Sequence, residues 1–177
     1  MRALILATLA LFPMAAFAAG SNDESPPTPT ATTLVCEKGM VWDVKTKKCV
    51  APQSGQLDDD TRYRAVRELA YDGQYKEAMQ VLATMSDQNE SRVLTYYGFT
   101  NRKSGNVELG MQYYDAALRV DPDNILARSY MGQGLVAQGE YDLARVQLAE
   151  IQNRGGRSTW AEKSLMTAIE TGVTYSF

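Results

Sequence analysis

The sequence contains no histidine and only two cysteines among its 177 residues. Without histidine, the chain lacks the most common general base, transition-metal ligand and pH-sensitive side chain. Two thiolates without a histidine also make a poor zinc site. No glycine-rich phosphate loop follows a predicted strand, and serine and lysine occur at no spacing typical of a nucleophile and its base. We therefore expect no enzyme activity, no metal and no cofactor.

Strong charge and long hydrophobic runs are also lacking. The net charge is −3, which is mild and opposite in sign to that of a nucleic-acid-binding protein. Hydrophobic residues make up 45% of the chain and charged residues 22%, which is typical of a globular protein with a core. We therefore expect a domain of ordinary size whose partners do not include nucleic acid.

The first 18 residues have the pattern of a cleavable signal peptide. A positive residue, Arg2, precedes an apolar run over residues 3–12, and Ala16-Phe17-Ala18 gives the small-x-small pattern of a cleavage site. The run is shorter than the ~20 residues that cross a bilayer. The sequence therefore predicts a periplasmic or secreted protein that does not span a membrane after cleavage behind Ala18.

Segment 34–51 contains both cysteines, Cys36 and Cys49, among residues that favour strands. In an oxidising compartment an even pair this close in sequence predicts a disulfide. The bond would close a two-stranded hairpin that is marginal by itself. Residues 19–33, rich in proline, serine and threonine, are predicted to be a disordered linker, and residues 52–58 a second linker.

The order Cys…Gly…Val-Trp-Asp…Thr…Cys-Val in this segment loosely resembles half the disulfide signature of small chitin-binding modules of the peritrophin type. The tryptophan in it, Trp42, has two interpretations. It either covers the disulfide or lies exposed and stacks on a sugar or a partner.

Beyond residue 58 the chain repeats. Gly73, Gly105 and Gly139 are separated by 32 and then 34 residues, and each is followed by a small residue five positions later. Glycine adopts the left-handed conformation that ends a helix, and the small residue lets two helices approach closely. The segment Asp121-Pro122-Asp123-Asn124 ends one helix and caps the next. The pattern predicts successive pairs of helices.

Several further positions match in fixed order, and with them the chain resembles the tetratricopeptide repeat family. The matched residues in the second and third repeats include Leu94, Tyr97-Gly98, Gly110, Tyr114, Ala117-Leu118, Pro122, Met131-Gly132, Leu135, Tyr141, Ala144, Leu148 and Ile151. The resemblance implies an all-α, helix-turn-helix repeat solenoid. Its parts would be three repeats at about 59–90, 91–124 and 125–153, a C-terminal capping helix over 158–171, and a tail over 172–177.

The family geometry implies that the first helix of each repeat lines a concave face, where we expect the partner to bind. The side chains implied are Tyr63, Arg67, Tyr71, Arg92, Thr95, Phe99, Arg102, Lys103, Ser129, Gln133 and Val136. Their mixture of aromatic area and cations suits an extended peptide with apolar and acidic groups.

The sequence thus leads to one main functional hypothesis and two alternatives. The main hypothesis is an exported tetratricopeptide-type scaffold that binds a protein or peptide through its concave face, in assembly or maintenance of the cell envelope. The first alternative is an envelope carbohydrate-binding protein that uses the Cys36–Cys49 hairpin and Trp42. The second is a homo-oligomer in which the short array completes its fold by self-association.

Overall fold

The computed structural model describes residues 26–174, so the predicted signal peptide lies outside the described part of the chain. Residues 26–174 form eight helices and one two-stranded hairpin. The predicted mainly helical fold, with a small disulfide-closed hairpin before it, is confirmed at this level. The elements in the first part are α1 (Ala31–Leu34), β1 (Val41–Asp43) and β2 (Lys48–Val50). The longer helices are α2 (Asp59–Tyr71), α3 (Tyr75–Leu82), α4 (Ser91–Lys103), α5 (Val107–Val120), α6 (Ile125–Ala137), α7 (Tyr141–Asn153) and α8 (Trp160–Thr171).

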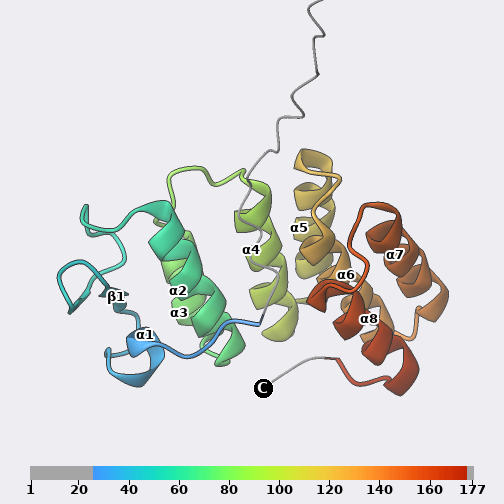
Figure 1. Cartoon of the computed structure of the whole chain (residues 1–177), viewed down its shortest axis with the longest axis horizontal. Helices are drawn as coiled ribbons and strands as arrows, with labels where there is room; N and C mark the ends of the chain where they lie inside the picture. Colours follow the sequence, from blue (N-terminus) through green and yellow to red (C-terminus); the bar gives the residue numbers. More distant parts are fainter. Residues whose placement is uncertain (1–25, 175–177) are drawn as a thin grey trace, which may run out of the picture.

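Helices α2 to α7 form three successive pairs that stand side by side in a row, and α8 packs against α6 at the end of the row (Figure 1). The turn inside each pair contains a glycine with a positive φ: +78° at Gly73, +94° at Gly105 and +81° at Gly139. A side chain would strain the backbone at these angles. The second helix of each pair begins two residues after its glycine, so the predicted helix-ending glycines are confirmed.

Small residues bring the helices of the middle pair into backbone contact. A Cβ atom on Gly98 would lie 2.5 Å from the Tyr114 ring, and one on Gly110 would lie 2.8 Å from the Gly98 carbonyl oxygen. Gly132 lies against α8 and not within its own helix pair. It makes room for Leu165 of α8, whose Cδ2 would be 2.6 Å from an added Cβ, because α8 rather than α7 packs on that side of α6.

The hairpin is built as the sequence predicts. Strands β1 and β2 are antiparallel, with Trp42 opposite Cys49, and a disulfide joins Cys49 to Cys36. Val41 is fully buried and belongs to the same apolar cluster as residues of α2, α4 and α6. The hairpin therefore packs on the helical part through Val41, which belongs to the apolar core of the helices.

Residues 26–34, here called the N-terminal arm, start on the α4 side, pass α2 and end in α1 (Figure 1). Thr30 caps α1, and four hydrogen bonds join Thr30 and Thr33 to the carboxylate of Glu68 on α2. The predicted disordered linker over 19–33 therefore does not extend through residues 30–33. The Glu68 carboxylate accepts hydrogen bonds from the amides and hydroxyls of this segment. The composition of the segment does not reveal this acceptor.

Candidate functional site

Most of the predicted concave-face residues lie inside the protein. We call the surface formed by α2, α4 and α6 the inner face. Nine of the eleven side chains predicted there are less than a tenth exposed: Tyr63, Arg67, Tyr71, Thr95, Phe99, Arg102, Ser129, Gln133 and Val136. Only Arg92 and Lys103 are partly exposed. The inner face is therefore mostly buried and does not form a solvent-lined groove.

Aromatic side chains fill the inner face. The rings of Tyr71 and Phe99 stack 5.6 Å apart with 5° between their planes, and the Tyr71 and Tyr130 hydroxyls are 2.6 Å apart. Trp160 of α8 lies 6.0 Å from Tyr71 and 6.1 Å from Tyr130, measured between ring centroids. These contacts join α2, α4, α6 and α8, and burying each ring removes a large apolar area from water.

The polar residues predicted on the third repeat face α8. The Ser129 hydroxyl donates to the Ala161 carbonyl at 2.8 Å, and the Gln133 amide donates to the Ser164 hydroxyl at 3.3 Å. Buried polar groups need such partners. The contact between α6 and α8 therefore accounts for Ser129 and Gln133.

The cations predicted on the inner face are not gathered at one site. Arg92 lies 4.9 Å from the Tyr63 ring centroid and forms an ion pair with Asp60 at 2.6 Å. Arg102 lies 5.8 Å from the centroid of Phe99, on its own helix. Burial and the neighbouring Arg102 lower the pKa of Lys103. Arg67 also lies over the Tyr63 ring, 6.0 Å from its centroid, so the cations form one group at Tyr63 and another at Arg102 and Lys103.

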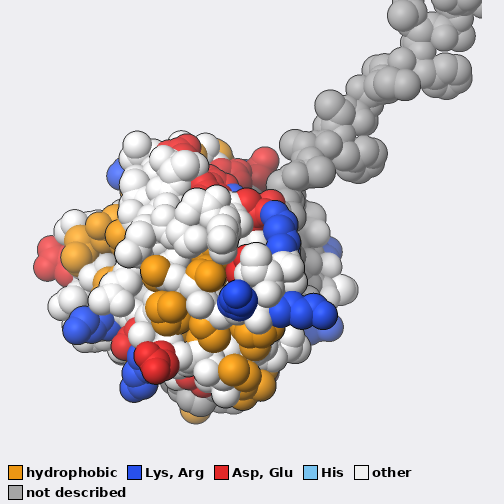
Figure 2. Space-filling view, turned by 90° about the vertical axis from the view of Figure 1, so that its left-hand side faces the viewer, with side chains coloured by type: hydrophobic (Ala, Val, Ile, Leu, Met, Phe, Trp, Pro, Cys, Tyr) orange, Lys and Arg blue, Asp and Glu red, His pale blue; other side chains and the backbone are white. Residues whose placement is uncertain are grey.

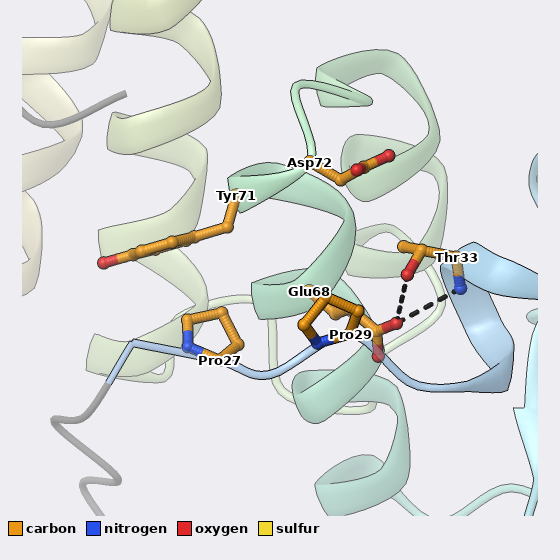
Figure 3. Close-up of a pocket in the computed structure, with 6 residues that line it drawn as sticks. All are labelled: Pro27, Pro29, Thr33, Glu68, Tyr71 and Asp72. Atoms are coloured by element: carbon orange, nitrogen blue, oxygen red, sulfur yellow. Dashed lines mark hydrogen bonds between the residues drawn. The ribbon is translucent and has the colours of Figure 1, made fainter. Parts of the chain in front are cut away.

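A small pocket of about 150 Å³ lies where the N-terminal arm passes α2. Three of its lining residues come from the arm and three from α2 and its C-terminal cap: Pro27, Pro29, Thr33, Glu68, Tyr71 and Asp72 (Figure 3). In Figure 3 the Tyr71 ring extends away from α2 above Pro27, while the Glu68 carboxylate points toward Thr33. The pocket therefore has an aromatic wall, a proline-lined wall and carboxylates.

Glu68 holds the arm in place. Its carboxylate accepts hydrogen bonds from the Thr30 amide at 2.6 Å and the Thr33 amide at 3.1 Å, as well as from both threonine hydroxyls. Hydrogen bonds to a carboxylate are stronger than those between neutral groups. The carboxylate also lies at the N-terminus of α1, where the peptide dipoles favour a negative charge.

Sequence reasoning did not identify Glu68 or its contacts with the arm. One signal was available: Glu68 lies three residues before Tyr71, so both side chains occupy one face of α2. Helix spacing, however, offers this carboxylate a nearer partner, Arg64, four residues before it. The residues that bond to it in the structure lie 35 or more positions away in the chain, and no spacing rule connects such distant residues.

Trp42 lies on the hairpin with part of its surface exposed. Neighbouring residues in a strand point to opposite faces, so Trp42 points away from the side on which Val41 and Asp43 are buried. It lies opposite Cys49 of the disulfide. Both interpretations of Trp42, disulfide cover and sugar contact, stay open in this geometry.

Over residues 26–174 we find no helix with the length and apolar character needed to cross a membrane. The same residues contain no group of three or more cysteine, aspartate or glutamate side chains placed to bind a metal ion. Comparison with protein-family models, curated proteins and solved structures gives no match for the chain.

Proposed function

We propose that this protein is an exported helical-repeat scaffold of the tetratricopeptide type that binds an extended protein segment beside α2, at the edge of the inner face. The repeated glycine turns and the close contact of α4 with α5 support the repeat assignment. The disulfide fits an oxidising compartment such as the periplasm or the exterior. Work in assembly or maintenance of the cell envelope is part of the same proposal.

One observation carries the proposed binding mode: the protein's own N-terminal arm already lies there. The arm brings Pro27 and Pro29 to the pocket that Tyr71 borders, and Glu68 holds the arm through Thr30 and Thr33. Proline-rich extended segments bind aromatic surfaces in many recognition domains because little entropy is lost on ordering them. A partner segment of similar chemistry would bind by replacing the arm.

The edge of the inner face suits this role better than its centre. The central side chains, such as Phe99 and Gln133, are buried against neighbouring helices and are closed to a ligand. Asp72, by contrast, is exposed next to the pocket, and the arm's Pro29 is exposed as well. The site therefore needs only the arm to move, and the helices can keep their packing.

The test is a binding measurement with a labelled peptide of residues 26–34 added to the folded protein. A Thr30→Ala, Thr33→Ala variant loses the two hydroxyl bonds to Glu68 and should open the arm. If the arm occupies the site about nine-tenths of the time, opening it raises the apparent affinity about tenfold. Thr28→Ala is the matched control, because Thr28 is exposed and lies outside the residues lining the pocket.

Fluorescence polarisation of the labelled peptide would report the result. Glu68→Ala should abolish binding in the open variant, because the four hydrogen bonds have no acceptor. Equal affinity for the parent protein, the open variant and the Glu68→Ala protein would contradict the proposed site.

A second candidate is glycan binding through Trp42, favoured by the partial exposure of this residue on the outer side of the hairpin. If this is the function, Trp42→Ala should abolish retention on cell-wall glycan, whereas the Thr30→Ala, Thr33→Ala variant should be retained like the parent. Retention of both variants would exclude it.

A further inference from the structure

Lysine is concentrated on the hairpin. Four of the seven lysines of the chain fall within residues 38–48, and all four are exposed: Lys38, Lys45, Lys47 and Lys48. Segment 34–51 contains no arginine, and its only acidic residues are Glu37 and Asp43, which leaves a net charge of +2. The whole chain has a net charge of −3. The hairpin is therefore a cationic end on an acidic protein.

Large aliphatic side chains are exposed on the same segment. Leu34 is 73% exposed, Val35 69% and Val44 58%. Val35 adjoins Cys36, whose disulfide leads to Cys49 opposite Trp42, and Val44 lies two residues after Trp42. Figure 2 looks onto this end of the molecule and shows hydrophobic side chains grouped toward the middle, with lysine and arginine, and some aspartate and glutamate, around them.

Of the two acidic residues of the segment, Glu37 is exposed and Asp43 lies inside the turn. Asp43 is buried and accepts hydrogen bonds from the Lys45 amide at 2.9 Å and the Thr46 hydroxyl at 2.6 Å, so it holds the turn from inside. The Lys45 ammonium lies 3.4 Å from Asp58, but both groups are more than half exposed. Water and salt weaken such exposed pairs.

The backbone of the turn also presents a lysine at an unfavourable position. Lys47 has a φ of +55°, a conformation that glycine adopts at less cost. A residue with a strained backbone at an exposed turn is consistent with a use for its side chain.

We propose that the hairpin binds an anionic lipid surface, with Leu34, Val35 and Val44 entering the headgroup region and the lysines facing lipid phosphates. Basic residues near an anionic bilayer each raise the affinity about fivefold, and exposed aliphatic side chains add apolar contact. A neutral sugar carries no charge for the lysines to attract, and sugars stack on flat aromatic rings rather than on aliphatic chains. The observations therefore favour lipid over glycan for this face.

The test is sedimentation of the disulfide-bonded protein, from Ala19 onward, with lipid vesicles. We expect it to bind vesicles of phosphatidylcholine mixed with phosphatidylglycerol, and not vesicles of phosphatidylcholine alone. A Lys45→Gln, Lys47→Gln, Lys48→Gln variant should bind about 100-fold more weakly. A Leu34→Ser, Val35→Ser variant should bind about tenfold more weakly, because exposed apolar area is lost.

Matched controls make the same kinds of substitution on the helical part. One control is Lys76→Gln, Arg145→Gln, Lys163→Gln, and the other is Leu143→Ser, Val146→Ser, all at exposed positions of the helical part. Both should bind the mixed vesicles like the parent protein. Thermal unfolding of every variant checks that loss of binding is not loss of folding.

Three results would overturn the proposal. The first is no sedimentation with the mixed vesicles, or equal losses in hairpin variants and controls. The second is retention on an anionic polysaccharide that the Leu34→Ser, Val35→Ser change leaves untouched, with no lipid binding. The third is self-association in light scattering that the three lysine changes abolish, with no lipid binding, which would make the occupant a second copy. The arm peptide test above is independent of all three.

Discussion

The hairpin and the helical part of this protein are held together in different ways. The helices bury tyrosine, leucine and valine side chains in clusters that run from α2 to α8, with glycines where backbones touch. The hairpin contributes only Val41 as a fully buried apolar residue and depends on a disulfide and a buried aspartate. A short hairpin with almost no core of its own therefore needs a covalent link and a larger neighbour.

Charge is divided between the two regions as well. Lysines gather on the hairpin, whereas arginines of the helices lie against rings and carboxylates, as Arg92 does with Tyr63 and Asp60. A guanidinium packs on flat groups more readily than an ammonium, which is more strongly hydrated. The helical part thus uses its cations for structure, and the hairpin leaves its cations in water.

Removing the disulfide should destabilise the hairpin much more than the helices. Replacing both cysteines by alanine removes a link that closes a loop of sequence separation 13, which should cost the hairpin about 3 kcal/mol. Amide hydrogen exchange should then become fast in β1 and β2, while α4 and α6 keep their protection. Equal loss of protection in the helices would show that the regions are one cooperative unit.

Gly110→Ala should destabilise the helical part by about 2 to 3 kcal/mol. Its Cβ would lie 2.8 Å from the Gly98 carbonyl oxygen and 2.9 Å from the Arg102 amide, both backbone atoms that cannot turn aside. Urea unfolding would measure the loss. Gly55→Ala is the control, since no heavy atom lies within 4 Å of its added Cβ and the free energy of unfolding should hardly change.

Asp58 stands between the regions and caps α2, accepting a hydrogen bond from the Thr61 amide at 2.8 Å. Asp58→Ala should lower the free energy of unfolding at pH 7 by about 1 kcal/mol. Hydrogen bonds from Thr61 lower the pKa of Asp58 to about 2. The carboxylate therefore stabilises the fold above its unfolded pKa of about 3.9, and this contribution disappears as the pH falls toward 2.

Unfolding of the parent and the Asp58→Ala protein at pH 7, 4 and 2 should show the difference shrinking at the acid end. Asp58→Asn provides a control, because asparagine caps without titrating. A difference that is constant over this pH range would contradict the role of the charge.

The smallest effect concerns Lys47. Lys47→Gly relieves the positive φ but adds chain entropy to the unfolded state, so we expect a stabilisation of about 0.5 kcal/mol or less. Thermal unfolding would measure it. Binding to anionic vesicles should weaken about fivefold in the same variant, so stability and binding would move in opposite directions; a parallel change would count against a role for this side chain.

The sequence predicts the features that depend on near neighbours. The turn glycines, the segment Asp121-Pro122-Asp123-Asn124 before α6 and the Cys36–Cys49 pair each depend on residues within a few positions of one another or on composition. These features determine where helices end and which residues pair locally. They are therefore visible without knowledge of the three-dimensional arrangement.

The burial of the inner face could not be predicted in this way. Tyr71 is covered because Phe99, Tyr130 and Trp160 come from three other helices, and Glu68 is bonded because the arm returns from more than 30 residues earlier. The family resemblance only implies that such side chains share one face of each helix. It does not say whether side chains from distant helices will meet and bury that face.

The ring contacts of Tyr71 have a consequence for how the helical part unfolds. In a linear array each pair contacts only its neighbours, so the ends fray before the middle. Here Tyr71 on α2 contacts Tyr130 on α6 and lies beside Trp160 on α8. The first helix pair is therefore in contact with the third pair and with α8. Unfolding of either end therefore removes contacts at the other end, so α2, α4, α6 and α8 should unfold together.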